Sequence, residues 1–320
     1  MPSVSATLAV DLGGTHMRCA VVSPDGQVLD RDEQPTPHDA GSDALVALMR
    51  AVSDQNSCDG CVVGVPGRVD YRSGQLEYAP NLPRGWVASL NEAALSSAVG
   101  LPVAVANDAD LAAVGEATHG AGREFSDVAY LTVSTGIGAG VVLGGLLVHG
   151  RRSLAEIGHT VIDADRLAAG GPATLEELGS GTALGRSAVA AGLGTVGADV
   201  VAAVARGDQR AMTAWAELVA VLAVGITNLA WLFTPEVIVI GGGLGLVGDV
   251  LLSPLRSAIA ADGPPAIEPG ISIVAAALGD DAGLVGAAGW HRAFVPEAAG
   301  RSIDAATKDA TDRAPEEETK

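Results

Sequence analysis

The sequence predicts an α/β protein built from two similar halves, and three observations support this fold class. Residues 8–15 form a short apolar run followed by a Gly/Thr turn, and residues 131–140 repeat that arrangement in the second half of the chain. A second apolar run follows each turn, at 19–22 and 141–143, so each unit is predicted to be strand, tight turn, strand. The chain has 320 residues, 48% of them hydrophobic, which suffices for two domains with apolar cores.

Secondary structure in the first third follows from apolar runs separated by turn residues. Pro24 to Gly26 predicts a hairpin turn, and Pro66 with Gly67 ends a strand. The order β-β-β-α-β-α-β is typical of a mixed sheet with helices on its faces. The expected elements are strands at about 7–12, 17–23, 27–33, 61–66 and 102–106, and helices at about 42–54, 87–98 and 108–117.

The second half begins with the same three strands and then becomes mainly helical. Its expected strands lie near 127–134, 139–144, 146–149, 237–240 and 271–276. Its expected helices lie at about 174–191, at 208–233, from the glycines at 241–243 to about 260, and at 282–294. We therefore predict a small N-terminal α/β domain at 1–108, a large α/β domain at 109–281, and a C-terminal helix at 282–295 that packs back on the first domain. Residues 296–320 have almost no large apolar side chain, so we predict a disordered tail.

Composition limits the possible binding partners of the protein and its cellular compartment. The net charge of −19 repels nucleic acid and anionic membranes, so we expect neither as a partner. Three cysteines make no disulfide framework, which favours a reducing cytoplasm. Cys58 and Cys61 have redox spacing, but 61–65 is predicted as a strand, so we interpret them as core or surface thiols. Residues 218–235 are uncharged over nearly a membrane span, yet Thr227 and Asn228 favour a buried helix.

The two Gly/Thr turns are candidate phosphate sites. Glycine allows a positive φ and a close approach of a ligand, and exposed backbone N–H groups in such a turn form a concavity that suits phosphate. Two similar turns in two halves suggest a duplicated unit that holds a phosphate chain between its halves. A pair of ordinary β-hairpins is the alternative interpretation.

Several polar residues are candidates for the chemistry. Asp108 follows a buried strand, where its carboxylate could act as a general base on a hydroxyl, or it could merely cap the next helix. Glu156 and His159 could hydrogen-bond neighbouring hydroxyls of a sugar. Residues 243–248 match a dinucleotide fingerprint, but the acidic residue it needs, Glu268, lies before the next strand and not after it. A Gly-rich turn that accommodates an adenosine fits better.

In their order, these motifs resemble the ROK sugar kinases, over residues 8 to about 293. The resemblance implies the actin/hexokinase-like ATPase fold, with two α/β domains and a cleft between them. It assigns nucleotide binding to the two turns and to the third glycine motif: Asp11, Gly13, Gly14, Thr15, Thr135, Gly136, Gly242 and Gly243. It assigns sugar binding to Gly67, Asn81, Asn107, Asp108, Glu156, His159 and Glu176, with Asp108 as the catalytic base.

Three departures from the family pattern stand out. His16 follows the first motif where Lys or Arg is frequent, and the second motif begins with Ser134 where glycine is usual. The zinc-binding cysteines of the family are absent, because their aligned positions are Leu167, Ala169 and Thr174. We therefore expect no zinc, a sugar-binding role alone for His159, and a loop at 163–174 held by burial of Leu167 and Leu175.

The resemblance implies ATP-dependent phosphorylation of a hexose at its 6-hydroxyl, most simply glucose. ATP and Mg²⁺ are the expected cofactors, with the metal near Asp11, and a homodimer in the cytoplasm is the expected assembly. An N-acetylmannosamine or N-acetylglucosamine kinase would use the same residues. A sugar-sensing repressor would need a helix-turn-helix segment before the first motif, and an NAD-dependent dehydrogenase would need no ATP.

Overall fold

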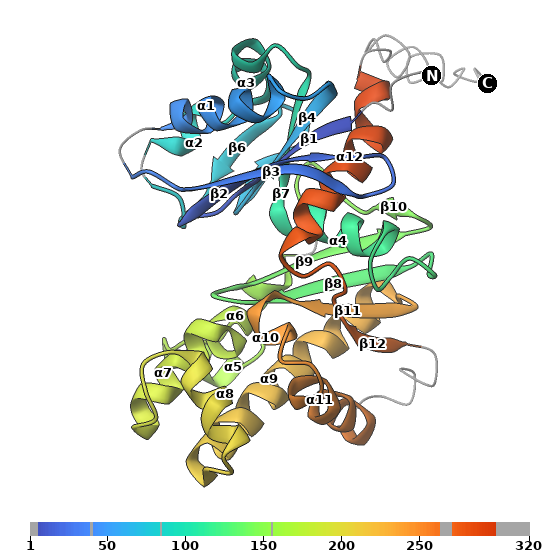
Figure 1. The fold of residues 1–320 in the computed structure, drawn as a ribbon. Coiled ribbons are helices and arrows are strands. Elements are labelled where there is room, and N and C mark those ends of the chain that lie inside the picture. Colours follow the sequence, from blue (N-terminus) through green and yellow to red (C-terminus); the bar gives the residue numbers. More distant parts are fainter. Residues whose placement is uncertain (1–5, 39–40, 84, 155, 263–270, 299–320) are drawn as a thin grey trace, which may run out of the picture.

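The computed structural model describes residues 6–38, 41–83, 85–154, 156–262 and 271–298. Two five-stranded sheets lie one above the other, and two helices fill the space between them (Figure 1). Residues 299–320, most of the predicted tail, lie outside the described residues, and so does Glu268.

The first sheet has the strand order β3-β2-β1-β4-β7. Its first three strands are antiparallel, and β4 and β7 run parallel to β1. The bounds are Ala6–Leu12 for β1, His16–Val22 for β2, Val28–Pro35 for β3, Cys58–Val65 for β4 and Val103–Asn107 for β7. All five strands predicted for this part of the chain are therefore present, and they follow one another along the chain as predicted.

The second sheet repeats this topology, with the order β10-β9-β8-β11-β12. Again the first three strands are antiparallel and the last two parallel to the central one. The bounds are Val128–Val133 for β8, Ile137–Leu143 for β9, Leu146–Leu147 for β10, Val237–Gly241 for β11 and Ser272–Ala275 for β12. The duplicated unit predicted from the two turns is thus present as two sheets of one topology.

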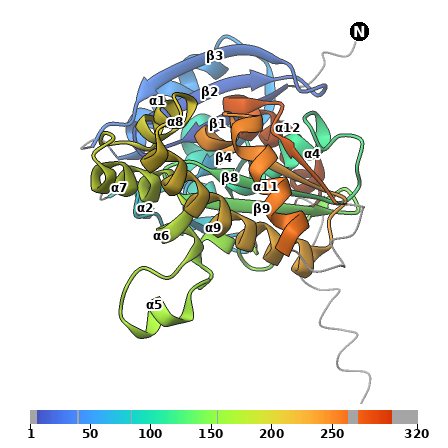
Figure 2. The same cartoon turned by 90° about the horizontal axis from the view of Figure 1, so that it is seen from below.

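Helices cover the outer faces of both sheets (Figure 1). On the first sheet they are α1 (Ser42–Ser53), α2 (Trp86–Ser89) and α3 (Glu92–Val99). On the second they include α6 (Leu175–Gly179), α7 (Gly181–Ala191), α8 (Gly197–Ala205), α9 (Gln209–Phe233), α10 (Gly242–Gly245) and α11 (Asp249–Asp262). A further short helix, α5 (Ala164–Ala168), lies on a segment that extends away from the body (Figure 2).

Three details differ from the sequence prediction. The helix expected at 87–98 is split, because Asn91 has extended backbone and its side chain caps α3. The helix expected at 174–191 is interrupted at Ser180, which is also extended and caps α7. Helix α8 and a hairpin of β5 (Arg68–Asp70) with β6 (Gln75–Tyr78) were not predicted at all.

The layer between the sheets consists of α4 (Asp108–Thr118) and α12 (Ala282–Ala298). Helix α12 packs on α4 and on β1, β2 and β4, so the last helix lies against the first sheet. Glycine makes this approach possible, because a Cβ on Gly286 would lie 1.7 Å from the carbonyl oxygen of Leu111.

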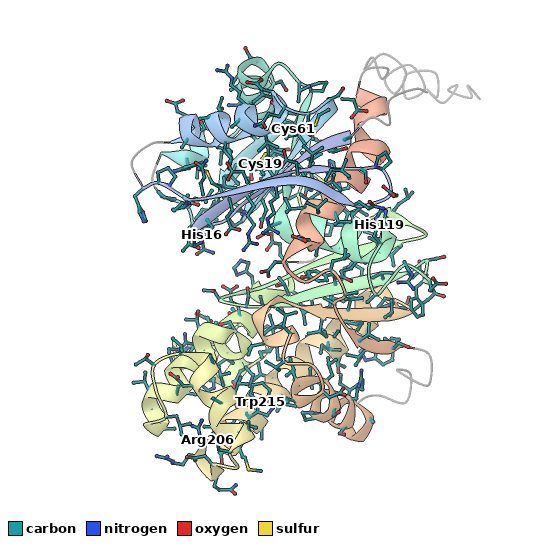
Figure 3. All side chains as sticks on the ribbon, in the orientation of Figure 1. His16, Cys19, Cys61, His119, Arg206 and Trp215 are labelled. Atoms are coloured by element: carbon teal, nitrogen blue, oxygen red, sulfur yellow. The ribbon has the colours of Figure 1, made fainter. Side chains whose placement is uncertain are left out.

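The structure shows where the Cys58 and Cys61 pair and the long apolar segment lie. Cys61 is fully buried on β4 and Cys58 is half-buried at its start, so both belong to a strand and neither begins a helix. Figure 3 shows Cys19 and Cys61 within the first domain. Helix α9 is long and apolar enough to cross a membrane, but one face packs against α6, α8 and α11. Its other face exposes Trp231 (50%) and Leu232 (69%), so the helix is only partly buried.

Candidate active site

The end of β7 and the start of α4 place Asn107 and Asp108. Asn107 is the residue that caps α4, since its side-chain oxygen accepts hydrogen bonds from the N–H groups of Ala109 (3.0 Å) and Asp110 (3.1 Å). Its side-chain nitrogen donates to the carbonyl oxygen of Gly67 at 3.0 Å. The capping role is therefore filled by Asn107. Asp108 accepts a hydrogen bond from the N–H of Ala109 through Oδ1 at 2.8 Å, and among the described residues its Oδ2 atom is left for chemistry.

The environment of Asp108 raises the pKa of its carboxyl from 3.8 to about 7. Burial is the main cause, because a carboxylate loses favourable interactions with water there, and the charge of Asp11 adds to the effect. The N–H of Ala109 opposes the rise, and the charge of Glu156 adds a smaller increase. A carboxyl with a pKa near neutrality suits proton transfer at physiological pH.

The first Gly/Thr turn connects β1 to β2. The N–H of Gly13 donates to the carbonyl oxygen of His16 (2.8 Å), and the hydroxyl of Thr36 donates to the carbonyl oxygen of Gly13 (2.6 Å). Within the described residues, the N–H groups of Gly14 and Thr15 donate no hydrogen bond. Two adjacent unpaired backbone donors of this kind form an anion-binding concavity. Figure 3 shows His16 at the end of the first sheet nearer the second sheet.

Asp11 and Arg18 lie opposite each other on β1 and β2 and line a cavity of about 250 Å³ together with Asp108. Burial raises the pKa of Asp11, and Arg18 partly offsets this, with its Nη1 atom 3.5 Å from Oδ2 of Asp11. Thr132, Ser134, Gly242 and Asp280 also line this cavity. The sequence prediction missed Arg18, although the pairing of β1 with β2 gives this arginine the same strand position as Asp11.

The segment that begins α7 holds the second Gly/Thr turn through two hydrogen bonds. The N–H of Gly181 donates to the carbonyl oxygen of Ser134, and the hydroxyl of Thr182 donates to that of Thr135, both at 2.7 Å. In the described part of the chain, the N–H groups of Thr135 and Gly136 have no acceptor. This turn therefore presents unpaired backbone donors in the same way as the first turn.

Glu176 supports the second turn. Its Oε2 atom accepts a hydrogen bond from the N–H of Ile137 at 2.8 Å, and a Cβ on Gly136 would lie 2.4 Å from the same oxygen. The structure thus places one oxygen of this predicted sugar ligand on the second Gly/Thr turn. Nearby, Gly242 has a φ of 74°, and a Cβ there would lie 2.6 Å from the carbonyl oxygen of Val133. Glycine is required at this position for both reasons.

A larger cavity of about 920 Å³ lies beside the second turn. Its wall is mostly apolar and comes from α7, α8 and α10, including Val189, Val196, Val201 and Leu244. Ser134 lines both cavities, and Gly242 and Gly243 line the smaller and the larger one respectively. A ligand with an apolar ring and an anionic chain could therefore occupy the large cavity and reach Asp108 past the second turn.

The remaining predicted sugar residues are brought together only in part. Glu156 precedes the short 3-10 helix η1 (Ile157–His159), and its Oε2 lies 3.9 Å from Nε2 of His159. Gly67, with a φ of 99°, is tied to Asn107 through its carbonyl oxygen. Asn81 approaches the first turn, since a Cβ on Gly14 would lie 2.3 Å from its carbonyl oxygen. The structure gives no contact between the side chain of Asn81 and the other members.

The loop at 163–174 is held differently from the prediction. Leu175 is fully buried as expected, but the expectation for Leu167 was wrong, because 55% of that residue is exposed. The anchor is instead a backbone bridge between Val161 and Thr174 and a capping box between Thr174 and Glu177. These polar contacts fix the base of the loop, and the exposed Leu167 does not anchor it.

Comparison with known proteins points to one family. The ROK family model matches residues 7–293. A glucokinase of Streptomyces coelicolor is 32% identical, covering 89% of this chain and 97% of that protein. An N-acetylmannosamine kinase of Escherichia fergusonii is also 32% identical, covering 88% and 97%.

Solved structures give the same result at the level of the fold. The glucokinase of Streptomyces griseus, solved in complex with glucose and AMPPNP, superimposes with a TM-score of 0.76 and 32% identity, covering 90% of this chain and 99% of that one. The fold is therefore the actin/hexokinase-like ATPase fold, in which two α/β domains enclose a cleft. The chain belongs to the ROK family of sugar kinases and related proteins.

Proposed function

We propose that this protein is an ATP-dependent hexose kinase that transfers the γ-phosphoryl group of ATP to the 6-hydroxyl of glucose. The observation that carries the proposal is the position of Asp108. Its carboxyl has a pKa of about 7 and lines the cavity that also holds Asp11 and Arg18. The glucokinases among its relatives support glucose as the first candidate substrate.

The nucleotide would occupy both cavities. Its adenine ring would lie in the large apolar cavity, and its phosphates would pass the unpaired N–H groups of the second turn toward those of Gly14 and Thr15. Arg18 would supply positive charge in a chain of strongly negative net charge. Its buried Nε atom lies 3.4 Å from Oε2 of Glu33, so the guanidinium would reach a phosphate oxygen through its Nη groups.

The proton would move to Asp108. As the 6-oxygen attacks the γ-phosphorus, its proton is accepted by a carboxylate whose pKa lies near the working pH. Glu156, His159 and Glu176, together with Asn81 and Asn107, would hold the other hydroxyls. Asn107 already uses its side-chain oxygen on α4, so a sugar hydroxyl could bind only through the second hydrogen of its amide.

The acidic residues at the small cavity fit a magnesium ion carried by ATP. Mg²⁺ prefers oxygen ligands, and the carboxyls of Asp11 and Asp280 line this cavity beside that of Asp108. When bound, the metal neutralises charge on the phosphates. Asp11 would then exchange its ion pair with Arg18 for the metal, which would release the guanidinium toward the phosphate.

An N-acetylmannosamine kinase is the second candidate, favoured by the equal identity of such a relative. A coupled assay of ADP release should be run on glucose, mannose, N-acetylmannosamine and N-acetylglucosamine. We expect glucose to give the highest kcat/KM. A clear preference for an N-acetylated sugar would replace glucose by the second candidate, and no turnover of any sugar would overturn the kinase proposal.

We further propose that the protein acts as a cytoplasmic homodimer, without nucleic acid or membrane as a partner. The exposed apolar residues on α9, Val224, Trp231 and Leu232, support self-association because they repeat along one face of the helix. Sedimentation equilibrium of the purified chain would decide between a monomer and a dimer.

A further inference from the structure

Asp110 is a buried carboxyl that the proposed reaction does not use. It lies in the first turn of α4 and is 0% exposed. Its Oδ2 atom accepts a hydrogen bond from the hydroxyl of Tyr71 at 2.6 Å, and its Oδ1 atom accepts one from the hydroxyl of Ser153 at 3.0 Å. The Tyr71 oxygen in turn accepts from the backbone N–H of Asn107 at 3.1 Å. We call these three side chains the Tyr71–Asp110–Ser153 network.

The network is costly to bury. A carboxyl withdrawn from water raises its own pKa, here to about 7, and the two hydroxyl donors only partly compensate. An apolar residue of similar size would avoid that cost. What the polar residues provide instead is fixed geometry, because each of the three bonds has a defined direction and length.

The network joins three segments that are distant in the sequence. Tyr71 follows β5, Asp110 belongs to α4, and Ser153 lies in the loop between β10 and η1. Asn107, whose N–H is held by Tyr71, is the residue directly before Asp108. Glu156 follows Ser153 by three positions along the chain. The network therefore connects the candidate base to the loop that carries a candidate sugar ligand.

The same loop is fixed to the β5–β6 hairpin by two further pairs. Arg151 binds one carboxylate oxygen of Asp70 through two nitrogens, at 2.6 and 2.8 Å. Arg152 binds Glu77 through both carboxylate oxygens, at 2.6 and 2.9 Å. These pairs are more exposed than Asp110 and hold the outer part of the loop, whereas the buried network holds the part beside α4.

We propose that Tyr71 and Asp110 are positioning residues for phosphoryl transfer, an inference that rests on the proposed kinase function. Tyr71 fixes the backbone of Asn107, and this sets the orientation of Asp108 at the end of β7. Asp110 fixes Tyr71 and Ser153 at once, which sets the distance between the base and the sugar loop. A misplacement of about 1 Å in such an arrangement can reduce a rate by about 100-fold.

The test compares two tyrosines of the same hairpin. Tyr71→Phe removes only the hydroxyl of the network, and Tyr78→Phe makes the same change at an exposed tyrosine. We expect Tyr71→Phe to lower kcat for the preferred hexose by about 10- to 100-fold, with little change in KM for ATP. The Tyr78→Phe control should keep the parental kcat. A role in stability alone would lower Tm without lowering kcat of the folded enzyme.

A second pair of variants tests Asp110. Asp110→Asn keeps the shape, can accept from Tyr71 and can donate to Ser153, so it should retain most of the parental kcat. Asp110→Ala removes both acceptors and should lose as much kcat as Tyr71→Phe. Equal kcat in these two Asp110 variants would overturn the proposal. If Asp110→Ala does not fold, the comparison of Tyr71→Phe with Tyr78→Phe decides alone.

Hydrogen exchange separates this inference from the proposed function. In Tyr71→Phe, the amides around the β7–α4 junction should exchange about tenfold faster than in the parent, because the N–H of Asn107 loses its acceptor. This result would support the positioning role even if the parent phosphorylated no hexose. Exchange at the junction equal to that of Tyr78→Phe would overturn the inference, whichever sugar the parent enzyme uses.

Discussion

Replacement of Asp108 by asparagine is expected to abolish most turnover and, at the same time, to stabilise the folded chain. Loss of a general base lowers a rate by about 10²- to 10⁴-fold. The amide keeps the size of the side chain, and α4 keeps its cap because Asn107 provides it. Folding should therefore survive the change, so that any loss of kcat reports on chemistry.

The stabilisation follows from the pKa of this carboxyl. A rise from 3.8 to about 7 means that ionised Asp108 costs the folded state about 4 kcal/mol. The folded chain binds this proton more tightly than the unfolded chain does, so the free energy of unfolding falls as the pH rises from about 4 to about 7 and then stays level. The asparagine variant has no such loss, and its advantage should be largest above pH 7.

The assay combines activity and thermal unfolding. The coupled ADP-release assay gives kcat, and calorimetric Tm values of parent and variant should be compared at pH 5 and pH 8. The Tm of the variant should exceed that of the parent by several degrees at pH 8, and by less at pH 5. Parental kcat/KM should rise with pH up to about 7 and then level off, since the base must be ionised. A variant with near-parental kcat, or with a lower Tm at pH 8, would refute the reasoning.

Three further predictions concern the rest of the site. Glu156→Gln should raise KM for the sugar by about 10- to 100-fold, since a charge-assisted bond is worth ~1.5–3 kcal/mol, and a selective effect on KM for ATP would place Glu156 on the wrong side of the cleft. Gly243→Val should raise KM for ATP but not for sugar. A Cβ on Gly243 meets no atom within 4 Å, so the valine side chain would extend into the space at the large cavity. Unchanged ATP kinetics would argue against an adenine ring in that cavity. Protein purified without added metal should contain no stoichiometric zinc, and elemental analysis showing about one zinc per chain would contradict both the alignment of the 163–174 loop and the role of His159.

The parts of the fold that were predictable are those with local causes. The two strand triplets follow from apolar runs on either side of Gly/Thr turns, and the long helix α9 follows from its uninterrupted apolar pattern. The β5–β6 hairpin was missed because its stability comes from distant partners, such as Arg151 for Asp70. The break at Ser180 has a local cause, because Ser180 stands between two glycines and caps α7, and a distant one, because the N–H of Gly181 bonds to Ser134. No pattern within the residues around 180 indicates that contact.

The candidate site shows the same division between local and distant causes. The sequence pointed to Asp108 but left two roles open, and the structure separates them by giving the capping role to Asn107. Arg18 could not be found from its own neighbours, because its importance depends on the register that pairs it with Asp11. Glu176 was placed among the sugar ligands, yet one of its oxygens is used on the second turn.

The position of α4 explains why one residue can serve both halves of the site. This helix contacts β7 of the first sheet, β8 and β9 of the second, and α12 between them. Its contact with β9 is close, since a Cβ on Gly140 would lie 2.6 Å from the Cβ of Ala113. Asp108 is the first residue of this helix, so both sheets fix its position. In the proposed reaction, a base that both sheets fix would keep its place between the sugar loop and the two Gly/Thr turns.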